Sequence, residues 1–214
     1  MTLAPQARTG FAALRQFVRR APAVERCALC GVNVAPVHQH LVDLENRAML
    51  CACDACAVLF SAKGETHYKR VPRRVRRMAE LRLAEDQWEN MAIPINMAFL
   101  YYNSRTGKPM AMYPSPAGAM ESSLRLSAWD DIVQSSSALR AMESDVEALL
   151  VNRLSTESHE YYIAPIDECY KLVGLIRTHW RGLAGGAQVW TELANFFDAL
   201  RDRAGTPVTE VLRA

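Results

Sequence analysis

The chain has no apolar run of about 18 residues, so we expect no membrane insertion. The first 21 residues contain Arg15, Arg19 and Arg20, and they lack the unbroken apolar core and the small-residue cleavage site of a secretory signal. Internal repeats and low-complexity tracts are also missing, which argues against solenoids and biased linkers. These absences predict a cytoplasmic globular protein.

The short motifs of several enzyme classes are absent too. The chain contains no P-loop, no dinucleotide-binding fingerprint, no Gly-x-Ser-x-Gly elbow and no His-x-x-x-His pair. Cys169 falls on the apolar face of a predicted helix, which favours a core residue over a nucleophile. We therefore predict no catalytic residues and a protein that is not an enzyme.

What the chain does have is a cluster of cysteines, five of its six lying between positions 27 and 56. Cys27 and Cys30 form one Cys-x-x-Cys pair, and Cys53 and Cys56 form a second. Two such pairs at this separation are typical of a tetrahedral four-thiolate site, because one tight turn aims both sulfurs of a pair at one ion. The sequence therefore predicts a structural Zn²⁺ in a zinc ribbon with rubredoxin-like knuckles.

The ligand set and the metal have alternatives. Cys51 could replace Cys53, and His38 or His40 could replace a thiolate. Because His38-Gln39-His40 alternates along a predicted strand, we expect only one of the two histidines to face the metal. Tetrahedral thiolates also suit iron, which is the less favoured metal since no electron-transfer partner is visible in the chain.

Charge divides the chain into a basic first part and an acidic remainder. Residues 1–82 carry 14 Lys/Arg against 6 Asp/Glu, whereas residues 83–214 carry 11 against 17. Much of the basic excess lies in one run, which contains Lys69, Arg70, Arg73, Arg74, Arg76 and Arg77. This run could bind nucleic-acid phosphates or an acidic protein partner. We favour a third interpretation, a connector that docks on the acidic second half.

These features predict an α+β chain of four parts. They are an N-terminal amphipathic helix in 1–24, a zinc-ribbon module in 25–62, a basic connector in 63–84 and an α+β domain in 85–214. Within the last part we predict strands at 94–102, 110–113 and 160–164, and helical segments at 128–133 and 145–153. Two amphipathic helices, starting at Pro165 and near Val189, close the chain.

Two further segments are candidate partner-binding or anion-binding sites. Ser115 lies between Pro114 and Pro116, in a stiff loop that is either functional or a plain structural turn. Arg177, His179 and Arg181 gather at the end of the first closing helix, where the helix dipole alone also favours cations.

Several segments together resemble an uncharacterised bacterial family, a domain of unknown function with a zinc ribbon found in gene neighbourhoods of nickel–iron hydrogenases. The segments are 27–31, 50–53, 113–119 and 174–182. The resemblance implies an accessory, maturation or assembly role and brings no catalytic residues. We therefore predict a non-catalytic accessory protein that binds a protein partner. A nucleic-acid-binding zinc-ribbon protein and a rubredoxin-like iron protein are the alternatives.

Overall fold

The fold was analysed in a computed structural model, which describes residues 24–61, 67–122, 126–134, 136–155 and 158–205. The amphipathic helix predicted near the N-terminus lies outside these residues. The elements run in the order β1 (Gln39–Asp43), β2 (Met49–Ala52), α2 (Asp54–Leu59), β3 (Tyr68–Arg70), β4 (Arg76–Arg77), α3 (Glu85–Asn90), β5 (Met97–Asn103), β6 (Lys108–Ser115), β7 (Gly118–Ser122), α4 (Leu126–Gln134), α5 (Ser137–Arg140), β8 (Glu147–Asn152), β9 (Glu160–Pro165), α6 (Ile166–His179) and α7 (Ala187–Ala204).

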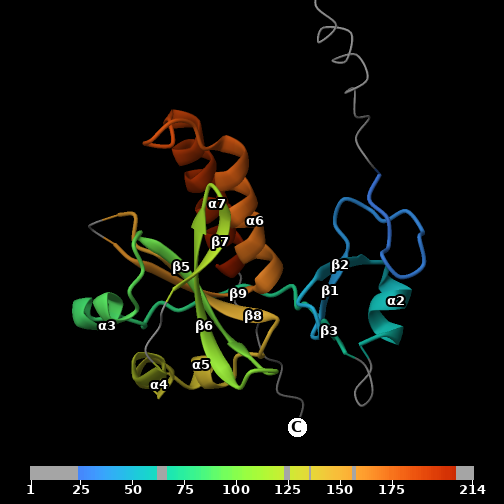
Figure 1. The fold of residues 1–214 in the computed structure, drawn as a ribbon, viewed down its shortest axis with the longest axis horizontal. Helices are drawn as coiled ribbons and strands as arrows, with labels where there is room; N and C mark the ends of the chain where they lie inside the picture. The colour runs from blue at the N-terminus through green and yellow to red at the C-terminus, as the bar shows by residue number, and fades with distance from the viewer. Residues whose placement is uncertain (1–23, 62–66, 123–125, 135, 156–157, 206–214) are drawn as a thin grey trace, which may run out of the picture.

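The larger part of the molecule is a six-stranded antiparallel sheet in the order β4-β9-β8-β5-β6-β7. Helices α6 and α7 lie together along one side of it, and the short helices α3, α4 and α5 lie at its other side (Figure 1). The mixed α+β class, with two closing helices, is confirmed. The strands predicted at 94–102, 110–113 and 160–164 correspond to β5, β6 and β9, and the helix predicted at 128–133 corresponds to α4.

Both faces of this sheet are covered, so its central strands are apolar on both sides. In β5, Phe99 packs in the core below α6 and α7, while Ala98 and Leu100 pack in the core below α3 and α4. The same alternation in β8 sends Leu150 to the first core and Leu149 to the second. Burial on both faces removes the alternation of polar and apolar residues that marks a half-exposed strand.

The helix predicted over 145–153 is wrong, because this segment is strand β8 (Glu147–Asn152) at the centre of the sheet. Its residues pair with β5 on one side and β9 on the other. A short apolar run gives the same signal for a buried helix and for a strand buried on both faces. Pairing with β5, about fifty residues earlier in the chain, makes this segment a strand. That pairing cannot be read from the sequence of the segment itself.

The N-terminal part forms a separate three-stranded sheet in the order β2-β1-β3, with α2 beside it (Figure 1). The predicted connector contributes a strand to each sheet, because β3 pairs with β1 and β4 pairs with β9. Val42 of β1 packs into the core below α6 and α7. Lys69 Nζ donates to the carbonyl of Ser144 at 2.7 Å, and His40 contacts Asp167 of α6. These contacts hold the small sheet against the rest of the fold.

The two closing helices follow the sequence prediction closely. Asp167 and Glu168 lie in the first turn of α6, where the helix dipole favours acids. Gly185 and Gly186 separate the helices, both with positive φ. Pro165 ends β9 and precedes the helix, whereas the sequence suggested the first helical position for it. Among the described residues, no helix combines the length and apolarity needed to cross a bilayer.

Candidate metal centre

The first cysteine pair lies in a tight knuckle that precedes β1. Gly31 donates its N–H to the carbonyl of Cys27 at 2.8 Å, and the N–H of Cys27 bonds to the carbonyl of Val32 at 2.8 Å. Gly31 has φ of 76°, a conformation that a residue with a Cβ rarely adopts. The knuckle is fixed to the small sheet because Ala28 N–H donates to the carbonyl of Cys51 in β2. Cys27 is buried and Cys30 is exposed.

The second pair lies where β2 ends and α2 begins. Cys53 is the N-cap of α2, with extended backbone, and its Sγ accepts the N–H of Cys56 at 3.5 Å. The helical turn then brings Cys56, which is buried, to the same side as Cys53. An N–H···S bond of this kind stabilises a thiolate, because the donor faces the charge.

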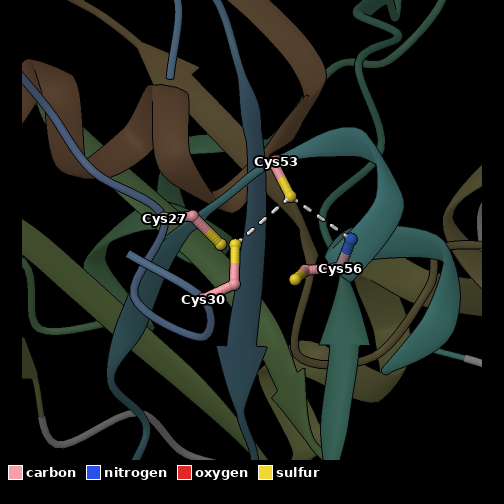
Figure 2. A group of neighbouring side chains, drawn as sticks. All are labelled: Cys27, Cys30, Cys53 and Cys56. Carbon is pink, nitrogen blue, oxygen red and sulfur yellow. Dashed lines mark hydrogen bonds between the residues drawn. The ribbon is translucent and has the colours of Figure 1, made fainter. Parts of the chain in front are cut away.

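Figure 2 shows the four side chains pointing toward one another from the two knuckles. The four sulfurs of Cys27, Cys30, Cys53 and Cys56 all lie within 4.8 Å of one another, and Cys30 Sγ is 3.8 Å from Cys53 Sγ. A tetrahedral zinc site with Zn–S bonds of about 2.3 Å places its sulfurs about 3.8 Å apart. The cluster is therefore compatible with one metal ion bound by four protein sulfurs.

The thiols of this cluster differ in acidity. Burial raises the pKa of Cys27, but backbone N–H groups of Cys53, Cys30 and Leu29 outweigh it and lower that pKa to about 6. Burial, together with thiol contacts to Cys53, Cys30 and Cys27, raises the pKa of Cys56 to about 12. One thiolate forms readily and the next is then opposed by its charge, so four thiolates need a cation between them.

The alternative ligands Cys51, His38 and His40 form a group of their own. Cys51 and His40 are directly opposite each other in the β1–β2 pairing. The ring centroids of His38 and His40 are 4.7 Å apart, and a ligand atom of each histidine lies within 4.8 Å of Cys51 Sγ. Alternation along a strand does not separate the two histidines as expected, because residues two apart share a face. Both histidines face Cys51, and the four-cysteine cluster is a separate group.

The arginines of the connector point partly into the protein. Arg74 Nε lies 3.2 Å from Glu147 Oε1, and Arg76 Nη2 lies 3.6 Å from Glu147 Oε2. Glu147 is fully buried in β8. Arg73 and Arg77 are exposed. Part of the connector is therefore paired with acids of the second half.

Ser115 occupies the tight turn between β6 and β7. Its hydroxyl donates to the carbonyl of Gly118 at 2.9 Å and accepts the N–H of Ala117 at 3.1 Å. Both bonds lie within the turn, as expected of a side chain that stabilises a hairpin.

The candidate residues at the end of α6 are near the surface. Arg177 is exposed, His179 is half-buried, and Arg181 is exposed. Arg181 lies beyond the last helical residue, and its side chain donates to the carbonyl of Trp180 at 2.8 Å.

Sequence reasoning missed two acids beside these candidates. Asp167 bonds to His40, 127 positions earlier, and Glu147 accepts from the connector. In the sequence, Asp167 is recognisable only as an acid near the start of the helix predicted from Pro165. Glu147 lay inside a segment predicted to be helical. No local signal joins either acid to its partner.

No curated protein and no solved structure matches this chain. The model of a family of unknown function, DUF5947, matches residues 26–204, which include all four clustered cysteines and both sheets. The chain therefore belongs to the DUF5947 family.

Proposed function

We propose that this protein is a non-catalytic accessory protein that binds a protein partner, and that the four-cysteine cluster holds a structural Zn²⁺. The cluster supports the zinc proposal because four sulfurs within 4.8 Å of one another are enough to complete a tetrahedral site. Catalytic zinc normally keeps one position for water, whereas closed four-thiolate sites stabilise folds. Metal content and a visible absorption spectrum test the metal. A colourless zinc protein is expected, whereas thiolate-to-iron absorption would favour an electron-transfer protein.

The observation that carries the partner proposal is an apolar turn between α6 and α7. Leu183 is fully exposed at its tip, and the exposed Trp190 lies 6.3 Å from the half-buried Trp180, measured between ring centroids. The indole N–H of Trp180 bonds to the carbonyl of Gly182 at 2.9 Å, and that of Trp190 bonds to the carbonyl of Ala184 at 3.3 Å. The two indole rings thus bond to the backbone on either side of the exposed Leu183.

This turn has the composition of a protein-binding hot spot. Tryptophan is enriched at the energetic centres of interfaces, and a preformed turn loses little conformational entropy on binding. Arg177 and Arg181 are exposed at the same end of α6, so the matching surface would be apolar with an acidic rim. The partner we propose is a component of nickel–iron hydrogenase assembly, which is supported by the family resemblance of the sequence segments alone.

Paired affinity captures from the native host test the proposal. Wild-type protein is compared with Leu183→Glu and with the control Leu154→Glu, which changes another exposed leucine. A protein retained by wild type and the control is then purified for calorimetry. We expect Leu183→Glu to bind it at least about tenfold more weakly, as for a hot-spot residue. Equal binding by all three proteins would reject the turn as the interface, and captured proteins unrelated to hydrogenase would reject that assignment.

A further inference from the structure

His38, His40 and Cys51 form a compact group on the small sheet. Cys51 of β2 faces His40 of β1 across the strand pair, and His38, just before β1, has its ring centroid 4.7 Å from that of His40. One ligand atom from each residue lies within 4.8 Å of those from the other two. The donors are two imidazoles and one thiol, a set that transition metals bind well.

His38 is already held in the orientation that a metal needs. Its Nδ1 lies 2.8 Å from the carbonyl oxygen of Ala35, which can only accept, so the proton is on Nδ1. In the neutral ring the other nitrogen, Nε2, then carries a lone pair. The side chain is only 7 % exposed, and Nε2 is buried with no hydrogen-bond partner among the described residues. A buried nitrogen without a partner is unfavourable unless a ligand satisfies it.

The ring of His40 is also oriented by a hydrogen-bond acceptor at Nδ1. Its Nδ1 lies 2.8 Å from Oδ2 of Asp167, in the first turn of α6. A carboxylate behind one imidazole nitrogen fixes the ring and raises the basicity of the other nitrogen, as behind metal-bound histidines generally. Both histidines thus have an acceptor behind Nδ1 and a second nitrogen left to bind a metal.

We propose that His38, His40 and Cys51 bind a second Zn²⁺, distinct from the ion of the four-cysteine cluster. Bond lengths of about 2.0–2.3 Å require the three ligand atoms to lie roughly 3.3–3.6 Å apart in a tetrahedral site. Small side-chain rotations reach this from the observed positions, since His40 is 25 % exposed and Cys51 is half-buried. The Cys51 thiol releases its proton to solvent as the metal binds, and both histidines bind in the neutral form.

Three protein ligands leave the fourth position of this site for an exchangeable ligand. His38 and His40 line a pocket of about 700 Å³, whose walls also carry three cations, Arg73, Lys171 and Arg203, and three acids, Glu25, Asp167 and Glu168. A water molecule can complete such a site, whereas four protein thiolates already complete a tetrahedral site. Because Asp167 belongs to α6, the same ion also strengthens the contact between the small sheet and the larger part of the fold.

Metal stoichiometry on the full chain tests the second site. Zinc-saturated wild type is compared with the double variant His38→Ala/His40→Ala by elemental analysis, and Co²⁺ titrations follow both proteins by absorption. We expect the double variant to bind one equivalent less than wild type and to keep the spectrum of the all-sulfur site. Cys30→Ser serves as the matched control and should lose the all-sulfur signal while keeping the mixed nitrogen–sulfur signal. Equal stoichiometry in wild type and the double variant overturns the proposal.

Asp167→Asn keeps all three ligands and tests the site without removing a ring. Loss of a carboxylate behind a metal-bound histidine typically weakens metal binding 10–100-fold. We therefore expect the affinity of the weaker Zn²⁺ equivalent to fall by about that factor, while the four-cysteine equivalent is unchanged. An unchanged affinity for both equivalents also overturns the proposal, and this result stands even if the double histidine variant does not fold.

Discussion

Arg74 Nε lies 3.2 Å from Oε1 of Glu147, so the basic connector is joined to the centre of the six-stranded sheet. Glu147 is fully buried and also receives the N–H of Glu143 at 2.8 Å. A carboxylate in this position needs the cations beside it, because an unpaired buried charge is costly. Two arginines of the most basic segment therefore have a structural role, which weakens the case for a nucleic-acid interface there.

Two glutamates contact Arg74, and they should differ in their contribution to stability. Glu147→Gln removes the charge that faces Arg74 and Arg76, and we expect the free energy of unfolding to fall by about 1–3 kcal/mol, the usual cost of an unsatisfied buried polar group. Glu143→Gln is the control, since Glu143 is 47 % exposed and 3.6 Å from Arg74. A pair of this kind contributes about 0–1 kcal/mol. Urea denaturation of both variants measures the difference, and equal losses would contradict this account.

The pairing of the connector predicts weak binding to nucleic acids. Binding through phosphate contacts requires several free cations and falls steeply with salt. With Arg74 and Arg76 engaged by Glu147, we expect labelled DNA and RNA to migrate unchanged with this protein, even at low ionic strength. An electrophoretic mobility assay checks this, with Glu147→Gln as a second sample that frees the two arginines. A salt-dependent shift with wild type would support the nucleic-acid alternative.

Short sequence patterns correctly predicted the parts of this fold that depend only on residues close together in the sequence. The two Cys-x-x-Cys pairs and the closing helices each follow from spacing within a short window, and the structure has all of them. Strand β8 was mistaken for a helix because its identity depends on pairing with β5, about fifty residues earlier in the sequence. The group of His38, His40 and Cys51 was visible as residues, but Asp167 joins it only through the tertiary fold.

Replacing one clustered cysteine should release one metal ion and loosen the small sheet. In Cys53→Ser the hydroxyl can still cap α2, because serine is a favoured N-cap residue. The variant therefore tests the loss of the metal-binding sulfur rather than the loss of the helix cap. We expect one zinc fewer per chain and faster amide exchange in 24–61, since metal binding and folding are coupled in such modules. Cys169→Ala removes the buried thiol of α6 and should leave the zinc content unchanged. Retention of all zinc by Cys53→Ser would contradict the assignment.

The pair of Glu160 and Arg201 should make stability depend on pH. Burial raises the pKa of Glu160, but hydrogen bonds from Arg201 and Tyr162 outweigh it and hold that pKa below its ordinary value of 4.5. The native state therefore favours the carboxylate, so this contribution to stability is present above pH 4.5 and is lost as pH falls through the lowered pKa. Tyr162 donates to Glu160 at 3.0 Å, and Arg201 Nε does so at 3.0 Å.

We expect Arg201→Met to lower the free energy of unfolding by about 1–3 kcal/mol at neutral pH, because Glu160 keeps its charge without its cation. The difference from wild type should shrink at pH values below 4.5, where the carboxyl is protonated in the variant. Arg177→Met, a change at an exposed arginine of α6, is the control. Denaturant titrations across this range measure the effect. A difference that stays constant as pH falls would mean that Arg201 acts through packing alone.

Two glycines in the turn between α6 and α7 separate backbone strain from crowding. Gly182 and Gly185 have φ of 63° and 86°, so alanine is strained at either position by roughly 1–2 kcal/mol. A Cβ at Gly182 meets no atom within 4 Å, whereas a Cβ at Gly185 lies 2.9 Å from Val189 Cγ1 and 3.2 Å from Trp180 Cε3. Val189 is fully buried in α7, so it has little room to move. We expect Gly185→Ala to cost about 1–3 kcal/mol more than Gly182→Ala, as overpacking does elsewhere. Thermal denaturation of the two variants compares their losses of stability. Equal losses would show that Trp180 and Val189 move aside to accommodate the added Cβ. The exposed turn would then be less rigid than its two indole hydrogen bonds imply.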